Sequence, residues 1–229
     1  MARHEQLRVN EIFHSIQGEG TRAGRRCVFI RLTGCHLRCT YCDTEYAFHE
    51  GRWMSFDAIL ERVRSYNCPF VELTGGEPLL QPNVYALMDR LCLEFATVAI
   101  ETSGAVSIER VNARVVRIVD FKTPSSGECA RNVWENVELL TGRDEVKFVI
   151  GDRADYDWSR DVVERFELCR RCPVLFSPVF GCRDASTLQL HKGRLDSREL
   201  AEWLLADRLN VRFATQLHKH IWTPEMRGV

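Results

Sequence analysis

Three cysteines lie close together near the start of the chain, where Cys35, Cys39 and Cys42 follow a C-x3-C-x2-C spacing. Thiolates are soft ligands that hold zinc or iron–sulfur clusters in proteins. A structural zinc site usually draws on two separated pairs of ligands, whereas three thiolates on a four-iron cluster leave one iron open for chemistry. The spacing therefore favours an iron–sulfur cluster. The alternatives are a zinc site completed by His36 or a distant cysteine, and three incidental buried thiols.

Polar residues that could hold a small molecule stand before and within the first apolar run of the chain. The segment Ile16-Gln17-Gly18-Glu19-Gly20 supplies an amide and a carboxylate on flexible backbone, which suits the polar edge of a heterocycle. Arg31 follows Phe29 by two residues, so in a strand the two side chains share a face. If that face lines an interior, the guanidinium needs a carboxylate or phosphate partner. The alternatives are that Gln17 and Glu19 are solvated loop residues and that Arg31 forms a structural ion pair.

The elements that position these residues alternate between strands and helices. Amphipathic helical patterns are predicted to begin with Ser55 as a cap, with Pro82 in the first turn, at Asp155 or Asp157, and with Ser197 as a cap. Short runs rich in apolar, β-branched and aromatic residues predict seven strands, at residues 27–32, 70–73, 97–100, 117–121, 145–150, 174–177 and 211–215.

This alternation predicts an α/β fold with a parallel sheet. Seven strands in 229 residues fall short of the eight units of a full TIM-like (β/α) barrel, so we expect a partial barrel or an open doubly wound sheet, in a single domain over residues 1–229. Polar and glycine-rich segments follow nearly every predicted strand. Because parallel strands place their C-terminal ends at one edge, these segments are expected to converge on one opening.

The composition is that of an ordinary globular chain. Hydrophobic residues make up 45% and charged residues 28%, which excludes wholesale disorder. The formal net charge of -1 indicates neither a basic nucleic-acid-binding surface nor an acidic tail. No signal peptide is evident, and no run approaches the roughly 18–20 apolar residues of a membrane helix. We therefore expect a cytoplasmic protein without nucleic-acid or membrane partners, whose clustered cysteines bind metal or do redox chemistry.

Around the cysteines the chain resembles the radical S-adenosylmethionine (SAM) superfamily. The resemblance implies a 4Fe-4S cluster on Cys35, Cys39 and Cys42, with its open iron chelated by the amino and carboxylate groups of S-adenosyl-L-methionine. Tyr41 stands where the superfamily carries an aromatic residue that approaches the adenine. Gly75-Gly76-Glu77-Pro78, one strand downstream, matches the element that meets the methionine amino group. The residue types suit that role, because glycines admit close backbone and a carboxylate accepts from an ammonium.

Over nearly its whole length the chain also resembles the 7-carboxy-7-deazaguanine synthase family of the 7-deazapurine (queuosine) pathway. That family converts 6-carboxy-5,6,7,8-tetrahydropterin into 7-carboxy-7-deazaguanine, with ring contraction and loss of ammonia. The resemblance implies a modified, partial barrel of the radical SAM type. The matching blocks are residues 15–20, 31–44, 73–78, 101–104, 120–127, 145–150 and 216–219.

This second resemblance implies roles for individual residues. Arg31 and His218 are the expected catalytic residues, with Arg31 facing the substrate carboxylate. Substrate contacts are expected from Ile16, Gln17, Gly18, Glu19, Arg31, Thr74 and His218. Contacts to SAM are expected from Tyr41, Cys42, Asp43, Gly75, Gly76, Glu77, Ser103, Ser125, Ser126 and Gly127.

Thr44, two residues after the last cluster cysteine, is the expected protein ligand of a Mg²⁺ ion beside the substrate carboxylate. One hydroxyl alone would hold the ion poorly, but Mg²⁺ keeps waters and accepts substrate oxygens, so substrate can complete its shell. Without the resemblance, Thr44 is equally well interpreted as a helix cap or a turn residue.

The resemblance also implies a reaction course and partners. A 5′-deoxyadenosyl radical takes a hydrogen from the ring carbon that bears the carboxylate, and the ring contracts while Mg²⁺ and Arg31 hold that carboxylate. The product radical then recovers the hydrogen. An external one-electron reductant, flavodoxin-like or similar, and a homodimer are expected.

Two features fit this scheme less directly. Cys169 and Cys172, with Cys182 ten residues on, could form a second metal site, although spare thiols at a helix end are the favoured interpretation. The connection from Cys42 to the helix at Ser55 is short, so the usual helix after the cluster is expected to be trimmed or replaced by residues 46–49.

Two other functions remain open from the sequence. An activase that makes a glycyl radical on a partner protein could carry a similar cysteine triplet, although Gln17 and Arg31 favour a small anionic substrate. A zinc-stabilised binding module could use the same cysteines without catalysis.

Overall fold

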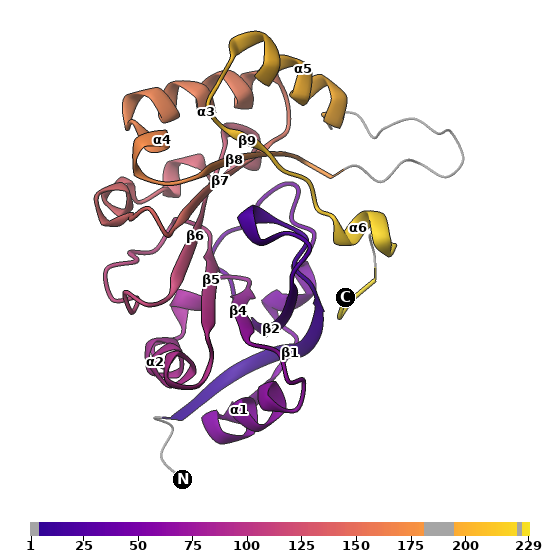
Figure 1. The fold of residues 1–229 in the computed structure, drawn as a ribbon, viewed down its shortest axis with the longest axis vertical. Coiled ribbons are helices and arrows are strands. Elements are labelled where there is room, and N and C mark those ends of the chain that lie inside the picture. Colours follow the sequence, from indigo (N-terminus) through magenta and orange to yellow (C-terminus); the bar gives the residue numbers. More distant parts are fainter. Residues whose placement is uncertain (1–4, 181–194, 224–225) are drawn as a thin grey trace.

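A single curved sheet of nine strands forms the frame of the molecule in the computed structural model (Figure 1). The structure describes residues 5–180, 195–223 and 226–229. The strand order is β3-β1-β2-β4-β5-β6-β7-β8-β9; β2 and β4 to β9 run parallel, whereas β1 is antiparallel to both of its neighbours. The strands are β1 (Gln6–Ile16), β2 (Arg26–Leu32), β3 (Arg52–Ser55), β4 (Phe70–Gly75), β5 (Thr97–Thr102), β6 (Val116–Phe121), β7 (Glu145–Ile150), β8 (Val174–Pro178) and β9 (Arg212–Phe213).

The larger helices lie outside the curve of the sheet (Figure 1). Each places an apolar stripe on the sheet; in α1, for example, the buried residues are Phe56, Ile59, Leu60 and Val63. None of the helices among the described residues is long and apolar enough to cross a membrane. The helices are α1 (Phe56–Arg64), α2 (Val84–Glu94), α3 (Arg153–Arg165), α4 (Leu168–Arg171), α5 (Ser197–Asp207) and α6 (His218–Ile221).

Alternation along each strand separates an apolar outer face from a polar inner face. In β4, Val71 and Leu73 are fully buried on the helix side, whereas Glu72 and Thr74 line a cavity on the other side. The parallel register continues this inner face across the sheet, because Arg31 pairs with Thr74 and Asp120 pairs with Lys147. The sheet thus presents a row of charged and polar side chains to its concave side.

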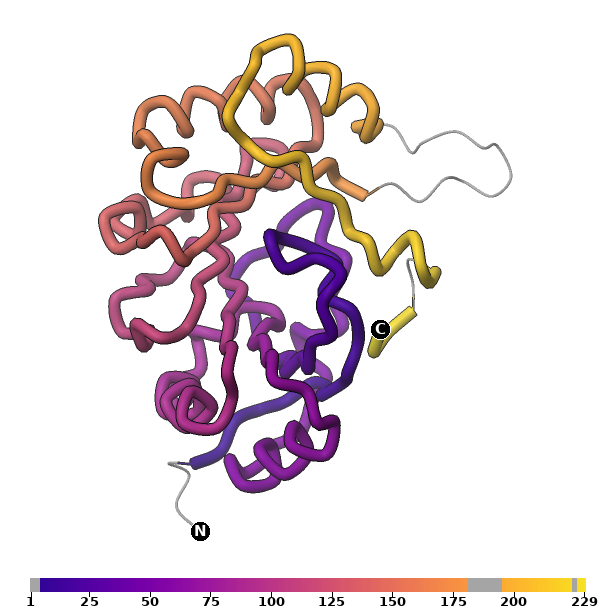
Figure 2. The backbone as a smooth tube through the Cα atoms, viewed as in Figure 1, coloured from indigo at the N-terminus to yellow at the C-terminus, as the bar shows by residue number. Residues whose placement is uncertain are grey.

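The sheet does not close, because its edges are β3 and β9. The chain that follows β9 crosses toward the N-terminal hairpin (Figure 2), where the Leu217 amide donates to the Gly18 carbonyl at 2.9 Å. The C-terminal segment therefore lies across the open side of a partial barrel.

All seven predicted strands are present, the last of them shortened to Arg212–Phe213, and the α/β partial-barrel prediction is confirmed. The sequence prediction missed β1 and β3. In β1 the apolar alternation of Leu7 and Val9 is interrupted at the register shift between Val9 and Glu11, where a polar residue stands at the next alternate position and Ile12 and Phe13 follow as adjacent apolar residues. β3 has four residues and an edge position, with little apolar signal.

Of the predicted helix starts, only Ser55 is confirmed as a cap, its hydroxyl accepting from the Ala58 amide at 3.2 Å. Asp152, not Asp155 or Asp157, caps α3, and Asp196, not Ser197, caps α5, through the Arg198 amide at 2.7 Å. In both helices an aspartate that precedes the predicted start is the cap. Pro82 lies two residues before α2 rather than in its first turn.

The segment after the cysteine loop forms a single 3-10 turn, Glu45–Phe48, and then enters β3 and α1. The expectation that residues 46–49 replace a longer helix is confirmed. Because this segment is short, the chain returns directly to the edge of the sheet, where β3 pairs with β1.

A buried ion pair fastens β6 to the loop before β7. Arg117 contacts Asp144 with both Nε and Nη2, at 3.0 and 2.5 Å, and Asp144 also accepts from the Thr141 amide and hydroxyl. Burial alone would raise the pKa of the Asp144 carboxyl, but these bonds, chiefly from Arg117, hold it below its usual range. Asp144 therefore contributes stability above its ordinary pKa, and that contribution is lost as the pH falls through its lowered value.

Replacing Arg117 with Met should lower the free energy of unfolding by about 3 kcal/mol at pH 7, because it leaves a buried carboxylate without its cation. The loss should shrink toward pH 4. In the variant the buried, unpaired Asp144 has a raised pKa, so at that pH it becomes protonated while the protein is still folded. Urea unfolding at the two pH values measures both effects. Arg64→Met, which breaks the surface pair Arg64–Glu94, is the control and should have little effect. An Arg117→Met penalty that grows on acidification would contradict this account.

Candidate active site

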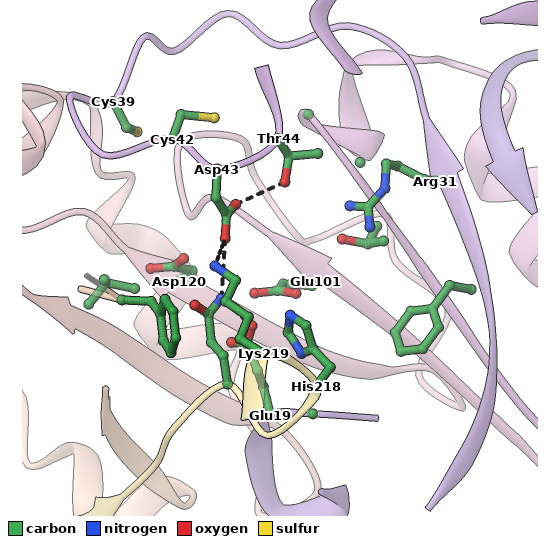
Figure 3. Close-up of a pocket in the computed structure, with 18 of the residues that line it drawn as sticks. Glu19, Arg31, Cys39, Cys42, Asp43, Thr44, Glu101, Asp120, His218 and Lys219 are labelled. Atoms are coloured by element: carbon green, nitrogen blue, oxygen red, sulfur yellow. Dashed lines mark hydrogen bonds and ion pairs between the residues drawn. The ribbon is translucent and has the colours of Figure 1, made fainter. Parts of the chain in front are cut away.

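A cavity of about 630 Å³ opens at the C-terminal ends of the parallel strands. Figure 3 shows its walls, with the cysteine loop on one side and charged residues from the sheet and the C-terminal segment on the other. The expected convergence of strand ends on one opening is confirmed. The predicted site residues that line the cavity are Ile16, Gln17, Gly18, Glu19, Arg31, Cys35, Cys39, Tyr41, Cys42, Asp43, Thr44, Thr74, Gly75, Gly76, Ser103 and His218.

The three predicted cluster cysteines all line this cavity and all are free thiols. The loop that carries them is folded on itself, with the Cys42 amide donating to the Cys39 carbonyl at 3.1 Å. Burial raises the pKa of each thiol, that of Cys39 to about 11. The three side chains are therefore neutral thiols near pH 7, and a metal that binds them must displace their protons.

The donor set fits a 4Fe-4S cluster better than a single ion. Three thiols line the cavity, and no fourth thiol of the described residues does. Three thiolate ligands match a cluster with one open iron. Among the described residues, no three His, Cys, Asp or Glu side chains are arranged to hold one metal ion. His36, one of the two fourth ligands that the zinc alternative offered, is not part of the cavity lining, and no described fourth cysteine lines the cavity either, so that alternative gains no support.

The start of the cysteine loop rests directly on the Gly75-Gly76 segment at the end of β4. The Glu77 amide donates to the Gly34 carbonyl at 2.8 Å. A Cβ at Gly76 would lie 2.3 Å from the Gly34 oxygen and 2.7 Å from the Cys35 Cβ. The first is a backbone atom and the second is bonded directly to the backbone, so neither can move aside unless the cysteine loop shifts. Gly76 therefore sets the position of the first cluster ligand.

Glu77 lies beneath the cavity rather than in its wall. Its carboxylate accepts from the Ser103 amide and hydroxyl at 2.7 and 2.6 Å, from the Thr102 hydroxyl at 2.9 Å and from the Leu79 amide at 2.9 Å. It ties the ends of β4 and β5 together and so orients Ser103, which does line the cavity. A direct contact of Glu77 with SAM stays a prediction.

The 3-10 turn η5 (Pro124–Ser126) supports the cysteine loop from outside the cavity. Thr40 donates its amide to the Ser126 carbonyl at 3.0 Å and its hydroxyl to the Ser125 carbonyl at 2.7 Å. Ser125 also donates its hydroxyl to Asp155. Ser125, Ser126 and Gly127 are absent from the lining, and their contact with SAM stays a prediction.

Arg31 projects into the cavity from β2 and is only partly committed to the protein. Its Nε donates to Glu11 Oε1 at 2.7 Å, and its guanidinium carbon lies 5.6 and 5.8 Å from the ring centres of Phe13 and Tyr46. Among the described residues, neither Nη group has a hydrogen-bond partner. The structural ion pair and the anion-binding role are therefore compatible, because Glu11 and the two rings fix a guanidinium whose outer nitrogens remain available.

Gln17 is bound at both ends of its amide. Nε2 donates to Glu72 Oε2 at 2.5 Å, and Oε1 accepts from the Glu19 amide at 2.9 Å. Glu72 is 1% exposed, and burial, with the charges of Glu101 and Glu19, raises its pKa to about 8. A neutral Glu72 beside an oriented amide gives this wall both donors and acceptors.

The C-terminal segment completes the cavity. His218 lies against Gly18, where a Cβ would come within 2.2 Å of His218 Nδ1, so only glycine admits the histidine ring. Burial lowers the pKa of His218, with Glu19 acting in the opposite sense, so the imidazole is neutral near pH 7. Two of the predicted substrate-binding residues, Gly18 and His218, are thus brought together from opposite ends of the chain.

Thr44 lines the cavity; it stands at the N-cap position of the following 3-10 turn, but its hydroxyl makes no capping hydrogen bond. Its hydroxyl donates to Asp43 Oδ1 at 2.9 Å, and Asp43 pairs with Lys219 (Figure 3). Burial alone would raise the pKa of Asp43, but the Lys219 ammonium holds it well below its usual range. Since the Thr44 proton is directed at Asp43, the lone pairs of its oxygen are available to a cation.

The sequence interpretation missed the charged residues of the inner wall: Glu72, Glu101, Asp120, Lys122 and Lys147. All five stand in or directly after strongly apolar runs. A charged side chain at alternate positions of such a run is the signal that could have found them, because buried charges are rare without a partner or a function.

The remaining cysteines do not form a second metal site among the described residues. Cys172 is buried, and the Cys169 thiol donates to the Asn210 carbonyl at 3.1 Å. Cys182 lies outside the described residues. Spare thiols remain the better interpretation of Cys169 and Cys172.

Comparisons with known proteins show what the chain is similar to. Residues 29–167 match the family model of the radical SAM superfamily. The chain is 43% identical to the 7-carboxy-7-deazaguanine synthase of Chlorobaculum tepidum, with 100% of both chains covered, and 45% identical to that of Koribacter versatilis, with 97% of this chain and 100% of the relative covered. The crystal structure of QueE from Escherichia coli has a similar fold, with a TM-score of 0.73 at 23% identity, covering 93% of this chain and 95% of that chain.

Replacing Gly76 with Ala should displace the first cluster ligand, because the added methyl group meets backbone that cannot move aside. After anaerobic reconstitution the variant should hold roughly half or less of the wild-type iron and sulfide. Gly142→Ala is the control, since its Cβ would have only an ordinary contact, at 3.8 Å. Full iron content in Gly76→Ala, with an unchanged far-ultraviolet spectrum, would contradict the role assigned to Gly76.

Proposed function

Since this chain belongs to the radical SAM superfamily and, within it, to the 7-carboxy-7-deazaguanine synthases, we propose that its cavity converts 6-carboxy-5,6,7,8-tetrahydropterin into 7-carboxy-7-deazaguanine, with ring contraction and loss of ammonia. The chain is thus a radical SAM enzyme of the queuosine pathway that takes a small-molecule substrate and an external one-electron reductant. Both family resemblances drawn from the sequence are confirmed. The homodimer and the cytoplasmic compartment stay predictions.

One observation carries the substrate assignment. A single cavity is lined by three free thiols and also by an available guanidinium and several buried carboxylates. The first feature suits a cluster with an open iron, and the second suits a molecule that has a carboxylate on one side and N–H groups on the other. A carboxypterin has both. A glycyl-radical activase acts on a protein substrate, whereas a cavity with such charged walls favours a small polar molecule.

The cofactors would be held by residues already in place. Cys35, Cys39 and Cys42 would ligate the 4Fe-4S cluster, and the Gly75-Gly76 backbone and the Tyr41 ring would bind SAM. When bound and reduced, this pair supplies a 5′-deoxyadenosyl radical able to take a hydrogen atom from an unactivated carbon. The Tyr41 hydroxyl, 3.2 Å from the Thr123 hydroxyl, fixes the ring at the ends of β6 and β7.

The protein's part in the reaction is to hold the substrate in one orientation and to exclude other hydrogen donors. The two Nη groups of Arg31 would bind the substrate carboxylate, and the rings of Phe13 and Tyr46 keep the guanidinium in place. Gln17, Glu72 and Glu19 would contact the heterocycle. The neutral His218 imidazole closes the cavity on the side of the C-terminal segment.

Thr44 would be the protein ligand of a Mg²⁺ ion, with the remaining ligands supplied by water and by the substrate carboxylate. The support for this role is the hydrogen bond to Asp43, which takes up the hydroxyl proton and leaves the oxygen lone pairs available to a cation. Lys219 in turn fixes Asp43.

The reaction itself predicts a transfer of label. With substrate deuterated at the carbon that bears the carboxylate, the anaerobic holoenzyme with SAM, Mg²⁺ and reductant should form 7-carboxy-7-deazaguanine. Deuterium should appear in recovered SAM or 5′-deoxyadenosine, because the abstracted hydrogen passes through the 5′ carbon. Mass spectrometry measures both. Product without label in either compound would refute the abstraction step, and no product would refute the substrate.

Replacing Thr44 with Ala should remove most of the stimulation of turnover by Mg²⁺, with about tenfold more Mg²⁺ needed for any given rate. Thr44→Ser keeps the hydroxyl and is the matched control, which should respond to Mg²⁺ as the wild type does. Titration of the rate with Mg²⁺ at saturating SAM measures the difference. An unchanged response in Thr44→Ala would remove Thr44 from the metal site.

A further inference from the structure

Lys147 is the most enclosed cation of the cavity wall, and the reaction scheme above gives it no role. It projects inward from β7, and its side chain is 7% exposed. Its ammonium lies 2.7 Å from Glu19 Oε2, bonds Glu101 Oε1, and lies 3.6 Å from Asp120 Oδ2. These carboxylates come from three different parts of the chain: the loop after β1, the β5 strand and the β6 strand. Lys147 thus joins the loop after β1 to the strands β5 and β6.

The charges around Lys147 do not balance without it. Asp120 has a second cation, because Lys122 contacts its Oδ2 at 2.9 Å. Glu19 and Glu101 contact no other cation within hydrogen-bond distance among the described residues. Several buried carboxylates facing one another would repel and take up protons unless a cation lay between them.

The pKa directions of Lys147 and its carboxylate neighbours agree with this balance of charges. Burial alone would lower the pKa of Lys147, but the surrounding carboxylates, Glu101 first, raise it well above its usual value, so the side chain stays charged. Burial would raise the pKa of Glu19, but Lys147, with smaller contributions from Gln216 and His218, lowers it below its usual value. One lysine does not suffice for every carboxylate, because burial leaves the pKa of Glu101 and of Glu72 raised.

The second oxygen of Glu101 is what this arrangement offers to a ligand. Lys147 occupies Oε1, and Oε2 has no hydrogen-bond partner among the described residues. Glu19 differs, because Gln216 Nε2 donates to its other oxygen at 2.9 Å. Glu101 lines the cavity, so its free oxygen is an acceptor for an N–H group inside it.

We propose that Lys147 is a positioning residue for the substrate: it holds Glu101 and Glu19 at the cavity wall so that the free oxygen of Glu101 accepts an N–H donor of the substrate heterocycle. The inference rests on the proposed function, which supplies a substrate with such donors. It assigns Lys147 no contact with SAM and no part in the cluster. The cost of losing it should therefore fall on substrate binding alone.

The test compares substrate binding in Lys147→Met, Glu101→Gln and the double variant. Binding is measured by anaerobic calorimetry with 6-carboxy-5,6,7,8-tetrahydropterin and the oxidised, SAM-loaded holoenzyme, which cannot turn over without reductant. Lys147→Met should raise the substrate Kd by about tenfold or more, because a charge-assisted hydrogen bond is lost, and should leave SAM affinity within about threefold. In the Glu101→Gln background, Lys147→Met should change the substrate Kd less than it does alone.

Arg117→Met is the matched control, since it removes a buried ion pair outside the cavity and should leave the substrate Kd unchanged. If Lys147→Met alone fails to fold, Glu101→Gln alone still tests the acceptor: it should raise the substrate Kd and leave SAM affinity within about threefold, and an unchanged substrate Kd there would overturn the proposal. A substrate Kd in Lys147→Met close to that of the wild type, equal losses of SAM and substrate affinity, or fully additive effects of the two substitutions would overturn the proposal. A wild-type holoenzyme that binds no pterin would overturn the proposed function instead, and the role of Lys147 with it.

Discussion

The contact between the Gly75-Gly76 backbone and the first residues of the cysteine loop is the constraint on which the rest of the site depends. A side chain at Gly76 would overlap the Gly34 carbonyl and the Cys35 side chain, so the loop can approach β4 only over bare backbone. From the other side, Thr40 bonds the 3-10 turn after β6. The loop is therefore held at both ends by the C-terminal ends of strands, and three thiols face one cavity while the space opposite them is left to a ligand.

Two parts of the cavity wall have opposite charge, Arg31 on β2 and the carboxylates around Lys147, and the fold explains how both are tolerated. Arg31 is kept in place by one carboxylate and two aromatic rings, which leaves its outer nitrogens free. The acidic wall is kept stable by Lys147, whose three carboxylate neighbours come from separate elements. Because parallel register places Asp120 beside Lys147 on the inner face, the charge balance of the wall is a property of the sheet.

The sequence predicted most of the fold and the chemistry of one end of the site. Apolar runs located all seven parallel strands, and the spacing of Cys35, Cys39 and Cys42 located the cluster loop. It did not predict β1, because polar residues at the bulge after Val9 interrupt the apolar pattern, nor the helix caps at Asp152 and Asp196, which compete with equally plausible neighbours.

The charged residues around Lys147 and the contacts of the C-terminal segment were harder to predict, because they pair residues that are distant in the sequence. Glu19 and Lys147 are 128 residues apart, and Asp43 and Lys219 are 176 residues apart. No local pattern encodes such pairs. Charged residues within apolar strands, such as Glu72 and Lys147, give only an indirect sign that a partner exists.

The central claim is that three thiolates hold a cluster whose open iron binds the methionine end of SAM. Electron paramagnetic resonance of the reduced, anaerobically reconstituted protein tests it most directly, with SAM labelled by ¹⁷O in the carboxylate and ¹⁵N in the amine. The account predicts that the cluster signal changes when SAM is added and acquires hyperfine coupling to both labels. A signal that SAM leaves unchanged, without coupling to either label, would show that the fourth iron is closed and would contradict the account.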